Sequence, residues 1–346
     1  MRHTTIVAAA AVALGAIASV HAQRAGGPAA WVLRDVAQQS FYLRNPEFVD
    51  ASQATFLTDS DRVLGLSGDG VTKAYPAAAI TWHHGIEDHL GTTPVFVTWC
   101  NECNTGMVYK AVINGQPAIF YHTNMVNQNM TFADAGTKTR WQQQTGEGID
   151  GPLKGQHLEY LPYVLTSWKE WRTRNPRTLV MQPVPGFEEF YTAMWNVIAW
   201  RTPDKAGPER IARKDGRLAA YEPIVGISAG GARRGYPRAL LKVERIVNDQ
   251  VGSEPVLLIY TTASDTVTAF SRRLDGRMLT FTRSASSGDI VDAETGSHWN
   301  AYGESASGPL KGKRLTGILG VPGFWYAWSS FGGDTDVYAG KGQPAR

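Results

Sequence analysis

The sequence predicts an α+β protein that is rich in antiparallel sheet, contains short helices, and consists of two tandem copies of one degenerate repeat unit packed together. Short runs of β-branched and apolar residues alternate with glycine-containing turns, which is typical of strands joined by tight connections. An Asn-Gly dipeptide at 114–115 separates two strand-like segments and indicates a hairpin. A set of Gly, Ser, Tyr and Pro residues recurs in the same order later in the chain, which indicates duplication.

The composition is that of an ordinary globular protein. The 346 residues are enough for two domains, and 43% of them are hydrophobic, so the fold does not depend on a disulfide for its core. The net charge of +3 is small, and no run of Lys and Arg is present. These two features argue against a nucleic acid as the partner.

Residues 1–22 are typical of a Sec signal peptide. A short basic start is followed by the apolar run "TIVAAAAVALGAIASV", and Val20-His21-Ala22 resembles a cleavage site. We therefore expect a mature chain that starts at Gln23, is periplasmic or secreted, and has no transmembrane segment. An uncleaved N-terminal anchor is the alternative. In an oxidising compartment two thiols form a disulfide unless a metal or a reductant protects them.

The repeat divides the chain into segments. "VLGLSGDGVTKAYP" begins at Val63 and "IVGISAGGARRGYP" at Ile224, and the pentapeptide "GPLKG" occurs twice. After the signal peptide, the predicted segments are an N-terminal arm at 23–60, a first repeat unit with the cysteine site at 61–181, a linker or excursion at 182–222, and a second, degenerate repeat unit at 223–346.

The elements of the first unit follow from local patterns. Residues 63–67 predict a short strand, 75–90 a helical or turn segment with Pro near its start, and 93–100 a buried strand. Residues 107–122 predict two strands around the Asn-Gly turn, and 165–181 predict a short helix that Asn-Pro ends, followed by a strand.

The two copies differ in their chemically reactive residues. When the two copies are aligned, soft or titratable side chains of the first unit correspond to residues of different chemistry in the second. These pairs are Cys100 and Thr261, Cys103 and Ser264, His83 and Glu244, His84 and Arg245, and His122 and Arg283. This asymmetry favours one active half and one supporting half.

Both cysteines lie in "FVTWCNECNTGMVYK", where a strand runs into a turn. Three interpretations stay open. Two thiolates could hold one soft metal ion. The pair could be a thiol-disulfide redox site, although such sites favour a helix N-terminus and a strand follows here. It could also be a structural disulfide that closes a very small loop. A c-type haem is excluded because Asn104, not His, follows the second cysteine.

A metal site would need ligands besides the two thiolates. Thiolate with thioether favours Cu(I), whereas a Cys2His2 set favours zinc, so the predicted ion is copper or zinc. Adjacent residues on a helix point about 100° apart, so His83 and His84 cannot easily face one ion together. The candidate ligands are Cys100, Cys103, His83, Met107 and His122.

Other recurring residues have simpler interpretations. Glu147 precedes the first "GPLKG" and is the candidate for proton transfer if the protein is catalytic. The "GPLKG" pentapeptide lacks the spacing and the strand-to-helix context of a phosphate loop, so we interpret it as a Gly-Pro turn. The recurring tryptophans are expected in the core, because both copies keep them.

The order "NPEFVDAS", "TWHHGIEDHLGTTPVFVTWCNECNTG", "RWQQQTGEGIDGPLKG" and "LTSWKEWRTRNPRTLV" resembles a bacterial family filed as domain of unknown function 3179. The resemblance is strong over 45–181 and weaker over 223–340, and it implies no established activity. One departure is Asn101-Glu102 in place of a more usual Pro-Leu between the cysteines. The positions that fall on the family's motifs are Trp82, His83, Cys100, Cys103, Trp141, Gly146, Glu147 and Trp168.

The leading functional hypothesis is an exported protein with a thiolate-centred site that binds copper or zinc. In this hypothesis the protein could also be a metalloenzyme. The first alternative is a non-catalytic module that binds a small-molecule or other extracytoplasmic ligand between the two copies and has a structural disulfide. The second alternative is a thiol-disulfide redox protein.

Overall fold

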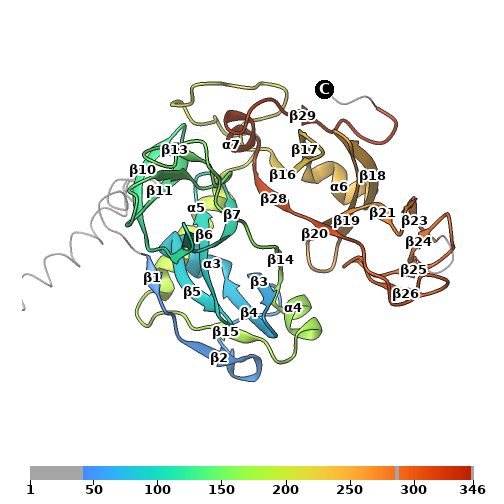
Figure 1. Cartoon of the computed structure of the whole chain (residues 1–346), viewed down its shortest axis with the longest axis horizontal. Helices are drawn as coiled ribbons and strands as arrows, with labels where there is room; N and C mark the ends of the chain where they lie inside the picture. Colours follow the sequence, from blue (N-terminus) through green and yellow to red (C-terminus); the bar gives the residue numbers. More distant parts are fainter. Residues whose placement is uncertain (1–41, 285–287, 344–346) are drawn as a thin grey trace, which may run out of the picture. The chain divides into compact units, whose positions relative to one another are not determined.

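The computed structural model describes residues 42–284 and 288–343, so the predicted signal peptide and most of the N-terminal arm lie outside the described residues. These described residues belong to one compact unit. The described part consists mostly of strands in several mainly antiparallel sheets, with five short α-helices (Figure 1). This confirms the sheet-rich α+β class. Among the described helices, none is long and apolar enough to cross a membrane.

The first half of the described chain, residues 42–222, contains three larger sheets. Their strand orders are β1-β5-β6-β7, β10-β11-β12-β13 and β14-β3-β4-β15-β2. The elements are β1 (Leu43–Arg44), β2 (Phe48–Asp50), β3 (Arg62–Gly68), β4 (Val71–Pro76), α3 (Ala77–His83), β5 (Gly85–Leu90), β6 (Thr93–Cys100), β7 (Thr105–Lys110), β8 (Val112–Ile113), β9 (Gln116–Pro117), β10 (Phe120–Val126), β11 (Asn129–Asp134), β12 (Arg140–Gln142), β13 (Gly148–Asp150), β14 (Tyr163–Ser167), α4 (Trp168–Arg174), β15 (Leu179–Met181) and α5 (Glu188–Trp200).

The second half, residues 223–343, contains sheets with the orders β28-β16-β17-β29, β18-β19-β20-β27 and β23-β24-β25-β26. The elements are β16 (Pro223–Ala229), β17 (Ala232–Pro237), α6 (Arg238–Glu244), β18 (Ile246–Val251), β19 (Glu254–Thr261), β20 (Thr266–Ser271), β21 (Arg273–Leu274), β22 (Arg277–Met278), β23 (Phe281–Arg283), β24 (Ile290–Asp292), β25 (His298–Trp299), β26 (Ser305–Ser307), β27 (Gly317–Ile318), β28 (Gly320–Phe324), α7 (Trp325–Ser330) and β29 (Asp336–Val337).

Several predicted elements are confirmed. The strand expected at 63–67 is β3, and the buried strand expected at 93–100 is β6, whose last six residues are all buried. The helix expected after residue 165 is α4, which ends at its C-cap Asn175 directly before Pro176, and β15 follows it.

Two predicted elements need correction. The segment 75–90 is helical only in α3, because His84 adopts a left-handed conformation at the C-cap and the alternating residues after it form β5. The Asn-Gly turn does join a hairpin, but its strands β8 and β9 have only two residues each. The longer neighbours diverge, because β7 pairs with β6 whereas β10 pairs with β11 in another sheet.

The tryptophans that recur in the sequence are buried, as expected. Trp171 of α4 lies over Gly65 so closely that a Cβ atom at this glycine would come within 2.3 Å of the indole ring. Trp328 of α7 covers Gly226 of β16 with the same 2.3 Å spacing. At both positions the absence of a side chain lets a helix pack directly on a strand. The internal repeat itself stays a prediction.

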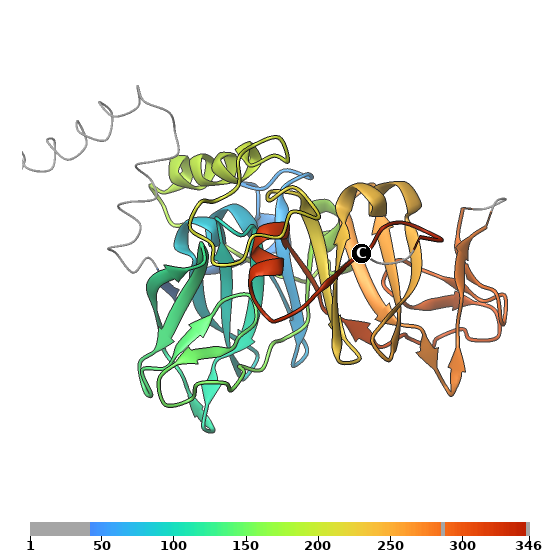
Figure 2. The same ribbon diagram turned by 90° about the horizontal axis from the view of Figure 1, so that it is seen from above.

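The segment expected as a linker or excursion, 182–222, includes the 13-residue helix α5. This helix packs against α3, as Figure 2 shows for the yellow-green helix and its teal neighbour. The largest hydrophobic cluster joins residues of both halves, and α7 and the end of β28 belong to it together with β6 and β7. The core therefore places part of the second half against the cysteine strand.

Candidate functional site

The cysteine turn connects the ends of two central strands. Cys100 is the last residue of β6, and β7 begins at Thr105 after a turn in which Asn104 has a positive φ of 52°. Cys100 and Cys103 form a disulfide with a Cα–Cα distance of 5.3 Å, and their exposed fractions are 1% and 0%. No helix begins at the pair, so the helix dipole that lowers the pKa of many redox thiols is absent here.

Residues from distant parts of the sequence cover this turn. The backbone N–H of Phe324, at the end of β28, donates to the Cys103 carbonyl at 2.9 Å. Arg201, at the C-terminal end of α5, donates from Nη2 to Glu102 Oε1 at 2.6 Å. Because Glu102 and Arg201 are both buried, the residues between the cysteines are fixed by an ion pair within the core.

The polar contact of Cys103 suits a thiol better than a thiolate. Its Sγ lies 3.1 Å from Oδ1 of Asn129, whose Nδ2 donates to the carbonyl of Asn127 at 2.9 Å. A disulfide sulfur carries no hydrogen, so this contact becomes a hydrogen bond only when Cys103 is reduced to a neutral thiol. A thiolate would face the partial negative charge of the amide oxygen. The surroundings therefore favour the disulfide or the neutral thiol over the metal-binding form.

The two adjacent histidines face different neighbours. His83 Nε2 lies 3.0 Å from the Tyr191 hydroxyl, and its ring packs beside Phe187. His84 lies on another side, with its ring centre 5.7 Å from that of His122 in β10. The histidine that lies beside the predicted ligand His122 is therefore His84 and not His83. The two adjacent side chains point in different directions, as expected from the 100° step between successive helical residues.

His84 and His122 are uncharged at neutral pH. Burial lowers the pKa of His84 from 6.5 to about 3, and the nearby His122 and His83 add to this effect, while the contact with the Trp99 carbonyl opposes it. Burial also lowers the pKa of His122. Each imidazole therefore keeps one nitrogen lone pair available as an acceptor or a ligand.

The other candidate residues lie in different surroundings. Met107 is buried in β7 opposite Thr98, so it shares a face of the sheet with Cys100. Glu147 lies in the turn between β12 and β13, half buried, with a backbone bridge to His157. Within the described residues, no group of three or more His, Cys, Asp or Glu side chains is arranged to hold a metal ion. Binding of copper or zinc, and proton transfer by Glu147, stay predictions.

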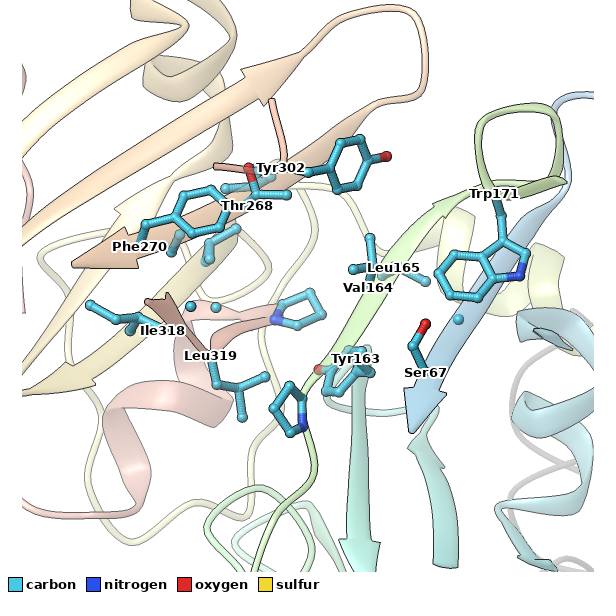
Figure 3. A pocket seen from close by; sticks show the side chains of 18 of the residues that line it. Ser67, Tyr163, Val164, Leu165, Trp171, Thr268, Phe270, Tyr302, Ile318 and Leu319 are labelled. Atoms are coloured by element: carbon cyan, nitrogen blue, oxygen red, sulfur yellow. The ribbon is translucent and has the colours of Figure 1, made fainter. Parts of the chain in front are cut away.

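A cavity of about 650 Å³ lies between the two halves (Figure 3). Its walls come from β3, β14 and the end of α4 in the first half, and from β20, β27 and β28 in the second. Phe270, Ile318 and Leu319 form one apolar side, and Trp171 lies on the other. A volume of this size suits a small organic molecule.

Polar groups gather at the rim of this cavity. The Arg174 guanidinium lies 3.6 Å over the Tyr302 ring, and its Nη2 lies 3.3 Å from Glu304 Oε2. Burial alone would raise the pKa of Glu304, but hydrogen bonds from Asn300 and Arg174 and the charge of Arg314 hold it below its usual value. The carboxylate therefore stays ionised and orients both arginines.

Arg62 connects the two halves beside the cavity. Its guanidinium donates to the carbonyl of Ser264 at 2.5 Å and to that of Leu165 at 3.0 Å. Burial lowers its pKa to about 10, so it keeps its charge at neutral pH. No motif in the sequence pointed to Arg62, Arg174 or Tyr302, because these residues come together only when the halves pack.

Comparisons with known proteins agree with the family resemblance of the ordered sequence motifs. The family model described as "Protein of unknown function (DUF3179)" matches residues 42–335, which is most of the chain. The chain belongs to this family. None of the curated proteins and none of the solved structures matches the chain significantly. Membership of DUF3179 therefore confirms the resemblance seen in the sequence and leaves the activity to be inferred from the structure.

Proposed function

We propose that this DUF3179 protein is an exported, non-catalytic module that binds a small organic anion in the cavity between its two halves. The observation that carries the proposal is the cavity itself, which is formed by both halves and combines apolar walls with a charged rim. Pockets that hold small molecules share this composition. Export is inferred from the signal peptide predicted at 1–22.

The charges around the cavity favour an anion. Four arginines and one carboxylate line it, and two further carboxylates, Asp265 and Glu170, hydrogen-bond to the lining residues Arg238 and Tyr302. An excess of one positive charge remains when all of these groups are counted. Since each guanidinium has five N–H groups, Arg174 keeps donors for a ligand carboxylate while it contacts Glu304.

The walls favour a flat apolar part of the ligand. Trp171 and Phe270 present aromatic surface from opposite sides, and the aliphatic residues Val164 and Leu165 of β14 lie between them. A ring carrying a carboxylate would place its apolar face on these side chains and its charge at the arginine rim. Duplication of one ancestral unit would explain how such a cavity arose between two similar halves.

In this proposal the disulfide is structural. The cysteine pair is buried beneath Phe324, and it lies outside the cavity lining. The Cys100→Ser, Cys103→Ser double variant should therefore keep ligand binding. A thiolate metal centre or a redox site would instead lose its chemistry in this variant.

The test combines native mass spectrometry of the exported protein with ligand-observed NMR, using benzoate and phthalate and the neutral benzamide. We expect the two anions to bind at least tenfold more tightly than benzamide. Ser67→Trp, an exposed β3 position on the cavity wall, should abolish binding by filling the space. Ser228→Trp, an exposed position on β16, is the matched control and should bind normally. No co-purified molecule together with no bound probe, or unchanged binding in Ser67→Trp, would contradict the proposal.

A further inference from the structure

His84 is an unusual residue to bury at the end of a helix. It is 7% exposed and caps α3 with a positive φ of 60°, a conformation that favours glycine or asparagine. Helix α6 ends in the same conformation at Arg245, but this side chain is exposed. The backbone conformation alone therefore does not require the inward position of the His84 imidazole.

The hydrogen bonding of His84 leaves one ring nitrogen unsatisfied. Nδ1 lies 3.4 Å from the Trp99 carbonyl, a contact in which Nδ1 carries the hydrogen and Nε2 keeps its lone pair. Nε2 is buried and has no hydrogen-bond partner. A buried polar atom without a hydrogen-bond partner destabilises the fold, so a ligand bound at this nitrogen would remove an existing cost.

The neighbours of His84 are suitable for one small cation. The ring centre of His122 lies 5.7 Å away, and the ring of Tyr42 lies 6.3 Å from that of His122. An imidazole nitrogen binds a metal at about 2 Å, so two imidazoles on one ion have ring centres roughly 5–6 Å apart. The Tyr42 hydroxyl is also buried without a partner.

We propose that His84 and His122 bind one metal ion of the kind that imidazole prefers, copper or zinc. This site differs from the thiolate site predicted from the sequence, and it does not depend on the proposed function of the cavity. His122 is partly exposed and provides the route for the ion. The register of β10 and β11 shifts directly after His122, so this side chain lies next to an irregularity of the sheet.

The remaining coordination positions would be taken by water or by a ligand from solution, because the described residues offer only two histidines here. The site would therefore be open rather than closed, as in metal centres that exchange their ligands.

The test uses the full exported protein with its disulfide intact, purified without chelator and loaded separately with Zn²⁺ and Cu⁺. We expect one ion per chain after gel filtration and a rise in melting temperature. His122→Phe and His84→Asn should each weaken binding of the preferred ion at least tenfold. Asn is chosen at position 84 because it tolerates the left-handed conformation. His89→Phe, an exposed position on β5, is the matched control.

Two results would overturn the metal proposal. The first is a folded wild-type protein that binds no more Zn²⁺ or Cu⁺ per chain than the two histidine variants do. The other is an ion that is lost in the Cys100→Ser, Cys103→Ser variant but kept by His122→Phe, which would establish the thiolate site instead. Neither result bears on the binding of benzoate or phthalate in the cavity.

Discussion

At the scale of single residues, the Glu102–Arg201 ion pair places two opposite charges in the core beside the cysteine turn. The two side chains are only 9% and 4% exposed. Burial raises the pKa of Glu102, and the adjacent Arg201 opposes this shift. Each charge is therefore tolerated in the core because the other is present.

Arg201→Ala should lower the free energy of unfolding by about 3–5 kcal/mol, because it leaves the Glu102 carboxylate buried without its partner. Urea unfolding followed by tryptophan fluorescence measures this change. Arg172→Ala, which removes a solvent-exposed pair with Asp59, is the control and should cost less than about 1 kcal/mol. Equal losses in the two variants would show that the buried pair has no special role.

At the scale of elements, the turn between β11 and β12 depends on one carboxylate. Asp134 accepts hydrogen bonds from the Thr137 backbone N–H at 2.5 Å, from the Thr137 hydroxyl at 2.7 Å and from Trp141 Nε1 at 3.0 Å. Burial alone would raise its pKa, but these hydrogen bonds outweigh burial and lower it from 3.8. The ionised carboxylate thus fixes both the turn and the buried tryptophan.

A carboxylate with a lowered pKa stabilises the fold above its unfolded pKa, and this contribution is lost as the pH falls through the folded value. Asp134→Asn should therefore destabilise the protein by about 1–3 kcal/mol at pH 7 and by clearly less at pH 3. Urea unfolding of both proteins at pH 7, 4.5 and 3 tests this. A difference that stays constant over this range would mean that the charge of Asp134 is not responsible.

At the scale of the whole molecule, the two halves share their core. Phe324, Trp325 and Tyr326 of the second half belong to the same hydrophobic cluster as the cysteine strand β6. The hydrogen bond from Phe324 to the Cys103 carbonyl and the one from Arg62 to the Ser264 carbonyl add polar connections between the halves. Neither half therefore contains all of the contacts that its own core requires.

A chain that ends after residue 222 should fail to fold cooperatively, because it exposes apolar surface that β28 and α7 cover in the full protein. Differential scanning calorimetry should show one main transition for the full chain and none for the truncated chain. Arg172→Ala in the full chain, which removes only a solvent-exposed pair, serves as the control and should keep one main transition. A cooperative transition of the truncated chain within a few degrees of the full protein would contradict this prediction.

The sequence by itself determined the features that depend on neighbouring residues. The run of apolar and β-branched residues in 93–100 predicted the buried strand β6, Asn-Pro predicted the end of α4, and the ordered motifs predicted the family. The position of the cysteines at the end of a strand was also readable, because strand periodicity and turn residues are local signals.

Only the tertiary structure decided the surroundings of these features. Three examples join residues that are far apart in the chain. Phe324 covers Cys103, His84 rather than His83 lies beside His122, and Arg62 and Tyr302 line the same cavity. Such contacts arise from the burial of apolar surface between whole sheets and helices, which is not directional. No short stretch of the sequence records this packing, so the candidate sites emerged only from the folded chain.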